Sequence, residues 1–266
     1  TGRIQFVVNT AYWQGDKREV GKAKENKANI QALEGELQGV EKSRGEIWMQ
    51  IPNLLSKDTP IGKGESENKV IRQWPASEQA TAGKGEPKKF SFKPKDHLEL
   101  GEALNIIDFK SGAKVAGSGF YYLKNEGVLL ELGLVRYALE FLKKKGFALW
   151  LTPDLAREKF YLGTGYQPRG PEAQTYTISD SDLGLIATAE VTLAAIHEGE
   201  TLPGETLPRR YAGYSHCFRQ EGGAYGKYSR GLYRVHRFTK VDMFAYARPE
   251  DSERMHDELL ALEEEL

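Results

Sequence analysis

The sequence predicts an α+β protein, in which a mostly antiparallel sheet is flanked by helices and preceded by a helical arm. Residues 17–50 and 128–145 carry apolar residues at steps of three and four, which is the period of an amphipathic helix. Residues 175–247 instead contain short runs of β-branched and aromatic residues that glycines interrupt. Helices before and after a block of strands are typical of the α+β class.

The composition limits what the protein can do. The 266 residues include 37 Lys plus Arg and 38 Asp plus Glu, so no overall charge attracts nucleic acid, and any anion site must be local. The single cysteine, Cys217, excludes an internal disulfide and is predicted to be a small buried strand residue. No run approaches the ~18 apolar residues of a membrane span, so we expect no membrane partner.

The first helical segment carries a seam of apolar residues, namely Ile30, Leu33, Leu37, Val40 and Ile47. Such a seam favours a partner helix, and it fits either a projecting coiled-coil arm or a helix packed on its own domain. Two glycines, Gly35 and Gly39, would each destabilise a helix interior by about 1 kcal/mol. Residues 51–68 are rich in Pro, Gly and polar residues and predict a linker. We therefore expect an arm over 1–55 and a second domain over 56–266.

Further elements follow in order along the second domain. A short helix is expected after Asp96, then a turn and strand over 115–127, a helix over 128–145 closed by Gly146, and a buried strand over 147–151. Short strands are predicted at 175–178, 185–191, 210–219 and 233–247. The last two flank a glycine-rich loop and predict an antiparallel hairpin with a long connection.

Side chains along the final strand should alternate between two faces. The predicted core face carries Val235, Thr239, Val241, Met243 and Ala245. The opposite face carries Arg234, His236, Phe238, Lys240, Asp242 and Phe244. On that face an Arg, a ring and a carboxylate follow at four-residue steps, about 13 Å apart at strand rise. Such a row could bind an anion, stack a base and bind an amine.

Two neighbouring segments could add to this face. Arg219 and Glu221 share a face of the preceding strand, and Thr188 and Glu190 do so in the segment "TAE". Guanidinium groups suit phosphate oxygens, and carboxylates suit an ammonium. A solvated charged sheet face remains open as the alternative.

The connecting loop carries Lys227 and Arg230 beside two tyrosines. It lacks the spacing of a phosphate-binding loop. It predicts a basic flap suited to a single-stranded RNA end.

These motifs resemble one family. The stretch "YSHCFRQEGGAYGKYSRGLYRVHRF" is similar to motif 2 of seryl-tRNA synthetase, a class II aminoacyl-tRNA synthetase. "TAE" is similar to that family's serine-binding loop, "GSGFYYL" to its motif 1, and "IPNLL…PIGKGESEN" to its link from arm to catalytic core. The resemblance covers nearly the whole chain and is to the organellar or bacterial type. It implies the class II antiparallel sheet flanked by helices, with a truncated N-terminal coiled-coil arm that would bind tRNA.

The resemblance implies roles for residues toward ATP. Arg219 would be the catalytic residue that holds the α-phosphate of ATP together with the serine carboxylate. Glu221 would contact the adenine amino group, and Arg234 would reach the γ-phosphate. Phe238 would stack on adenine, and Val235 would complete the ATP site.

The resemblance also implies serine and tRNA contacts. The serine amine and hydroxyl would be held by Thr188, Glu190 and Asp242. Lys227 and Arg230 would contact the acceptor end of tRNA. The final carboxylate is usually Glu in the family, so Asp242 is one methylene shorter, and Gly119 stands where motif 1 often has Arg.

The activity implied is that of a serine–tRNA ligase, which forms seryl adenylate from serine and ATP with Mg²⁺ and passes the acyl group to tRNA(Ser). Motif 3, with its metal-binding carboxylate, is missing, so we expect a piece of a longer protein and assign no metal ligand within it. A homodimer and a mitochondrial matrix location are expected, with the cytoplasm as the alternative. A catalytically silent paralogue, acting as a structural or RNA-associated subunit, and an amino-acid:carrier-protein ligase are the competing functions.

Overall fold

The computed structural model describes residues 17–48, 50–51, 55–57, 59–69, 90–166, 174–221 and 231–266. The chain divides into two compact units, Thr1–Gly85 and Glu86–Leu266. Residues 56–85 therefore group with the first unit, whereas the sequence placed a boundary near residue 55. The assignment of separate functions to 1–55 and 56–266 stays a prediction.

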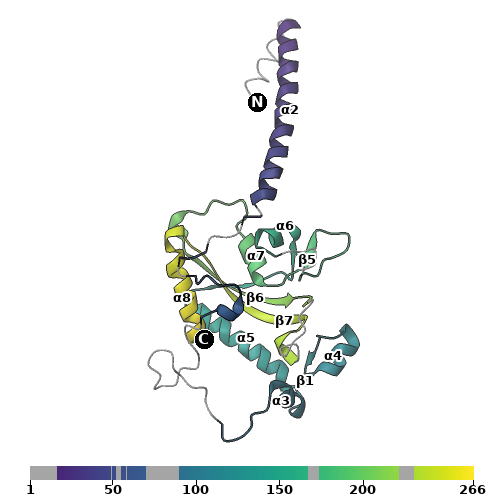
Figure 1. Cartoon of the computed structure of the whole chain (residues 1–266), viewed down its shortest axis with the longest axis vertical. Helices are drawn as coiled ribbons and strands as arrows, with labels where there is room; N and C mark the ends of the chain where they lie inside the picture. The colour runs from purple at the N-terminus through teal and green to yellow at the C-terminus, as the bar shows by residue number, and fades with distance from the viewer. Residues whose placement is uncertain are drawn as a thin grey trace. The chain divides into compact units, whose positions relative to one another are not determined.

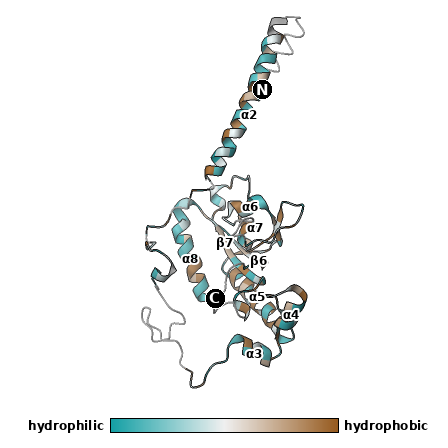
Figure 2. Cartoon of the chain, turned by 45° about the vertical axis from the view of Figure 1, so that its right-hand side comes forward, coloured by the Kyte–Doolittle hydropathy of each residue, from teal (hydrophilic) through white to brown (hydrophobic). Residues whose placement is uncertain are grey.

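The predicted N-terminal helix is confirmed as α2, Lys17–Trp48. Gly35 and Gly39 lie inside it without interrupting it. The seam residues Leu33, Leu37 and Val40 are 63%, 56% and 66% exposed, so the described residues leave most of the seam uncovered. Figure 2 shows hydrophilic colours along α2 interrupted by brown bands.

The second unit begins with α3, His97–Ala103, where a capping box forms. The Asp96 side chain accepts from the Glu99 N–H at 2.9 Å, and the Glu99 carboxylate accepts from the Asp96 N–H at 3.0 Å. The expected strand within 115–127 is Tyr122–Leu123, labelled β2, which pairs antiparallel with β1, Ile107–Asp108. Between these two strands lies helix α4, Phe109–Ala116.

The central sheet has the order β3–β6–β7. The predicted hairpin is confirmed, because β6 (Arg209–Phe218) and β7 (Arg237–Tyr246) pair antiparallel along all 10 residues of each strand. The remaining strand, β3 (Ala148–Leu151), runs parallel to β6. A separate antiparallel pair is formed by β4 (Leu155–Arg157) and β5 (Leu183–Leu185).

Helices cover both faces of the central sheet (Figure 1). One face packs on α5 (Glu126–Lys144) and α8 (Ser252–Glu265), the expected helix before the sheet and the helix after it. Val241 and Met243 of β7 contact the buried cluster of Leu142, Phe147 and Leu262 there, which confirms the predicted core face for these two residues.

The opposite face of the sheet packs on α7 (Ala189–Ala195), beside the short helix α6 (Glu158–Gly163). Leu193 of α7 belongs to a buried cluster with Tyr211, against which Phe244 packs. The face predicted to bind ligands is therefore partly a second core.

Two predicted strands begin or end elsewhere. The expected strand 185–191 stops at Leu185, because Thr188 takes the N-cap position of α7 and starts a helix. The expected strand 233–247 starts only at Arg237. A 3-10 turn, Gly231–Tyr233, precedes it and begins at a glycine with φ +78°.

Two other strands differ in burial or extent. The predicted strand at 147–151 is present as β3, but it is not buried, since Leu149, Trp150 and Leu151 are 39–75% exposed. The predicted strand at 175–178 reduces to a single bridge from Thr177 to Gly184.

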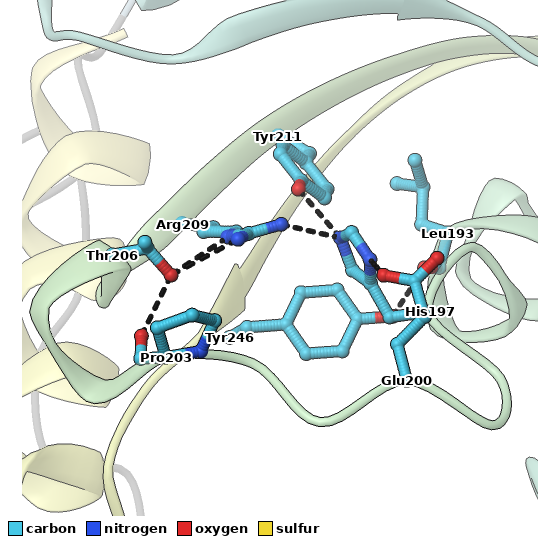
Figure 3. A network of polar contacts seen from close by, with 8 residues as sticks. All are labelled: Leu193, His197, Glu200, Pro203, Thr206, Arg209, Tyr211 and Tyr246. Atoms are coloured by element: carbon cyan, nitrogen blue, oxygen red, sulfur yellow. Dashed lines mark hydrogen bonds and ion pairs between the residues drawn. The ribbon is translucent and has the colours of Figure 1, made fainter.

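A polar network anchors the C-terminal end of α7 to the sheet (Figure 3). The Tyr246 hydroxyl donates to the Leu193 carbonyl at 2.7 Å, and the His197 ring lies 2.8 Å from the Tyr211 hydroxyl. Glu200 lies 2.7 Å from the other ring nitrogen of His197. These contacts fix the helix whose opposite end carries Thr188.

Candidate functional site

The hairpin register brings the predicted ligand-facing residues together. Phe238 lies opposite Cys217, Lys240 opposite Ser215, and Asp242 opposite Gly213. Because alternate residues share a face, Phe238, Lys240 and Asp242 lie on one side of the sheet, as the sequence predicted.

Arg219 lies just beyond the end of β6 and meets Phe238. Its guanidinium carbon is 5.1 Å from the centre of the Phe238 ring, which is the geometry of a cation–π contact. Its Nε atom donates to the Ala187 carbonyl at 3.3 Å. Among the described residues its two terminal nitrogens make no hydrogen bond, so they are placed to bind an anion.

Arg234 and Glu221 form an ion pair of 3.0 Å. Glu221 has a φ of +48°, and its side chain is 19% exposed against 49% for Arg234. Because β7 begins at Arg237, Arg234 does not belong to the strand face, contrary to the alternation that the sequence suggested. The structure nevertheless brings it to Glu221. Val235, in contrast, is buried at 4% exposure.

His236 connects Arg219 to the loop that resembles motif 1. Its Nδ1 atom lies 2.9 Å from both the Arg219 carbonyl oxygen and the Tyr176 hydroxyl. Its backbone N–H donates to the Gly119 carbonyl at 3.0 Å. A Cβ atom on Gly119 would come within 2.4 Å of the His236 ring, which explains why a glycine stands at this position.

A second cluster joins the start of α7 to β7. The Asp242 carboxylate accepts the Ala189 N–H at 3.2 Å through Oδ2, and its Oδ1 lies 2.9 Å from the Lys240 ammonium. The same ammonium donates to the hydroxyl oxygen of the buried Thr188 at 2.6 Å. Glu190, the second residue of α7, is exposed.

Two residues of this region had no role in the sequence analysis. Lys240 was placed on the correct face, but its contacts depend on α7 and were not visible in the strand pattern. Tyr166 packs beside the cluster around Ile186. Burial raises the pKa of its phenol, the charge of Glu190 raises it further, and Arg219 lowers it. Tyr166 is therefore within electrostatic reach of the site.

Cys217 is fully buried beneath this face, as predicted. Burial raises the pKa of its thiol, which the Ser215 hydroxyl at 3.3 Å partly offsets. A protonated thiol of this kind is a packing group rather than a nucleophile.

Other predicted contacts lie outside the described residues. Lys227 and Arg230 both belong to 222–230. Within the described part of the chain, no group of three or more His, Cys, Asp or Glu side chains could hold a metal ion. None of the described helices combines the length and apolarity of a membrane span.

Comparison with known proteins places this arrangement in a family. Residues 176–266 match the model of the tRNA synthetase class II core domain of the G, H, P, S and T enzymes. This part of the chain therefore belongs to the class II tRNA synthetases, and the predicted fold class is confirmed.

Within that class, the chain is similar to serine–tRNA ligases, which confirms the resemblance seen in its motifs. It is 53% identical over 249 residues to the enzyme of Rubrobacter xylanophilus, covering 94% of this chain and 56% of that protein. It is 51% identical over 255 residues to that of Dictyoglomus turgidum, covering 95% of this chain and 58% of the relative. The chain thus spans little more than half the length of the curated relatives it matches.

Solved structures give the same result. The seryl-tRNA synthetase of Pyrococcus horikoshii complexed with ATP superposes with a TM-score of 0.79 at 37% identity, covering 98% of this chain and 61% of that one. The cytoplasmic serine–tRNA ligase of Naegleria fowleri in complex with AMP gives a TM-score of 0.76 at 28% identity, covering 99% and 61%.

Proposed function

We propose that the protein containing this chain is a serine–tRNA ligase, which activates serine with ATP and transfers it to tRNA(Ser). One observation carries the proposal: an arginine over an aromatic ring and a Thr–Lys–Asp cluster lie side by side on one sheet face. The first pair suits a nucleotide, and the cluster suits a small polar amino acid. The nucleotide complexes of the similar structures support this assignment.

The nucleotide would lie along Arg219 and Phe238. The terminal nitrogens of Arg219 would bridge the α-phosphate and the serine carboxylate, which places the attacking oxygen near the phosphorus. Adenine would stack on Phe238 beside Val235. Glu221 would accept from the adenine amino group, and Arg234 would move from its ion pair with Glu221 toward the γ-phosphate.

Activation is a single displacement. A serine carboxylate oxygen forms a bond to the α-phosphorus, the bond from that phosphorus to the bridging oxygen breaks, and pyrophosphate leaves. The chain's part is to hold the two reactants in line and to stabilise the charge that develops, which Arg219 is placed to do. Seryl adenylate then gives its acyl group to the tRNA, whose acceptor end Lys227 and Arg230 would contact.

The serine would lie at the Thr188 cluster. Glu190 is exposed at the start of α7 and would bind the substrate ammonium. Thr188 and Asp242, which Lys240 and the start of α7 link, would contact the hydroxyl. Mg²⁺ would enter with the ATP phosphates. We therefore assign no step to magnesium in this chain.

A homodimer is proposed from the surface of α5. Leu129, Leu130, Leu132, Leu134 and Tyr137 are all more than half exposed. Leu130 and Leu134 line a cavity of 520 Å³ together with Ile107 and Leu123. Exposed apolar surface of this kind favours burial against a second copy.

Two further assignments rest on the sequence and its relatives. The uncovered seam of α2 supports a coiled-coil arm for tRNA. The bacterial type of the motif 2 run supports the mitochondrial matrix as the location, with the cytoplasm as the alternative, and microscopy of the tagged complete protein would decide between them.

The test is serine-dependent exchange of pyrophosphate with ATP by the complete protein. Exchange should require serine, and Arg219→Ala should lower it at least a hundredfold, because an anion-stabilising group in the transition state contributes about 10²–10³ in rate. Lys110→Ala, on the exposed surface of α4, is the matched control. A complete protein that binds ATP but shows no exchange would instead support the silent paralogue.

A further inference from the structure

We propose that Lys240 is a positioning residue of the serine site, which fixes the hydrogen-bonding directions of Thr188 and Asp242. The inference rests on the proposed function and adds a residue to it. The inference is based on the Lys240 ammonium, which contacts both groups: Thr188 Oγ1 at 2.6 Å and Asp242 Oδ1 at 2.9 Å.

The position of Lys240 follows from the strand. Lys240 and Asp242 are two residues apart on β7 and share a face, with the Cα atoms roughly 7 Å apart at strand rise. Lys240 can thus reach a carboxylate that stays close to its own strand. A side chain one methylene longer than that of Asp242 would carry its carboxylate farther from β7. An aspartate at this position therefore suits a partner on the same strand, namely Lys240.

Both oxygens of Asp242 are engaged. Oδ2 accepts the Ala189 N–H, and Oδ1 accepts from Lys240. The Asp242 side chain is only 19% exposed and that of Lys240 30%. Because an unpaired charge in such a setting is costly, the ion pair with Lys240 holds the carboxylate in one orientation. A carboxylate has about four lone-pair sites, so acceptor capacity remains for a ligand.

Thr188 is constrained in a different way. A hydroxyl has two acceptor lone pairs and one proton. Thr188 Oγ1 accepts from Lys240 at 2.6 Å and from the Glu190 N–H at 3.4 Å, so both lone pairs are directed at donors within the chain. What remains is the proton, so Thr188 can act toward any further partner only as a donor.

The remaining donor of Thr188 and the remaining acceptors of Asp242 decide which part of serine each residue can bind. A substrate ammonium has only donors, so Thr188 cannot receive it, and the ammonium is left to Glu190. The serine hydroxyl can accept from Thr188 and donate to Asp242 at the same time. Lys240 thereby shapes a site for a hydroxyl group, which an alanine side chain would leave unsatisfied.

The experiment compares Lys240→Met with wild type and with Lys110→Met in the complete protein, by serine-dependent pyrophosphate exchange. Lys240→Met should raise the KM for serine about tenfold or more, as expected for the loss of a charged hydrogen bond, with the KM for ATP within twofold. Selectivity for serine over alanine should fall by a similar factor. Lys240→Arg, which keeps the cationic donor, should recover part of the loss, and Lys110→Met should match wild type.

The outcomes separate the two proposals. An active wild type whose Lys240→Met variant keeps its serine KM and its selectivity would overturn the role of Lys240 alone. Equal rises in the KM values for serine and ATP would also overturn it, because they indicate a structural role. If Lys240→Met does not fold, Lys240→Gln and Lys240→Arg provide the same comparison. A wild type without exchange would overturn the proposed function itself.

Discussion

At the scale of single residues, the contacts around Gly119 explain why it differs from the arginine that motif 1 often has. Its φ is +83°, and a Cβ atom there would come within 2.4 Å of the His236 ring. His236 in turn contacts the carbonyl of Arg219. The glycine thus makes room for the ring that helps to hold the predicted catalytic arginine.

We predict that Gly119→Ala destabilises the protein and lowers activity. Gly117→Ala is the matched control, because its φ is +101° but nothing lies within 4 Å of the new Cβ. Both variants should lose about 1–3 kcal/mol from backbone strain, measured by urea unfolding. Only Gly119→Ala should also lower pyrophosphate exchange, since it displaces His236. Equal effects of the two substitutions on exchange would contradict this explanation.

A second prediction at this scale concerns Cys217. Only the thiolate reacts with thiol reagents, and burial raises the pKa of this thiol above its ordinary value. The folded protein should therefore modify far more slowly at pH 8 than the same protein in 6 M guanidinium chloride. Mass spectrometry after labelling measures both rates. Rapid labelling of the folded state would show that the site face opens often.

The residue scale was also where the sequence was most informative. Alternation along the strand placed Phe238, Lys240 and Asp242 on one face, because the side-chain period of a strand is fixed at two. Arg234 was assigned to the same face wrongly, since the alternation was extended across a turn. The contacts of Lys240 with Thr188 could not be predicted, because they join residues 52 positions apart along the chain.

At the scale of elements, helices were easier to predict than short strands. Repeated apolar spacing defined α2 and α5 over many turns, whereas the "TAE" segment has too few residues for a period. Its β-branched and apolar neighbours favoured a strand over 185–191. The capping oxygen of Thr188 instead begins α7, and this turn is what brings Thr188 to Asp242.

Replacing glycine by alanine should have opposite effects on stability inside a helix and just after one. Gly35 lies inside α2 with open space around it, and Gly146 follows α5 with a φ of +87° and open space as well. Gly35→Ala should stabilise α2 by about 1 kcal/mol, seen as roughly fivefold slower amide exchange of α2 peptides. Gly146→Ala should instead destabilise the second unit by about 1–2 kcal/mol. If both substitutions stabilised the protein, the φ of the glycine would not decide whether alanine stabilises or destabilises it.

At the scale of the whole molecule, the two faces of the central sheet are divided between stability and binding. The face on α5 and α8 packs around the apolar cluster of Leu142, Phe147 and Leu262. The other is packed under α7 at its Phe244 end and carries the charged cluster and Arg219 toward its other end. One hairpin therefore anchors the fold with alternate residues and presents the site with the rest, which explains how a single strand pattern could predict both.

The last prediction concerns assembly. The leucines of α5 lie in the second unit beside β7, and Figure 2 shows brown positions along this helix. If two copies bury these leucines against each other, the complete protein has twice the mass of its chain in light scattering. Leu130→Asp and Leu134→Asp, at positions 59% and 60% exposed, place a charge in that contact and should give monomers, because a buried unpaired charge is strongly unfavourable.

The control is Leu260→Asp on α8, which is 45% exposed and lies outside the α5 surface. It should leave the mass and the exchange activity unchanged. If the protein stays dimeric with both α5 substitutions, the dimer contact lies elsewhere. A monomeric wild type would contradict the proposed homodimer. Helix α5 packs directly beneath the hairpin that carries Arg219 and Asp242, so a second copy on α5 would support the position of that hairpin. Monomers formed by the α5 variants should therefore also lose exchange activity.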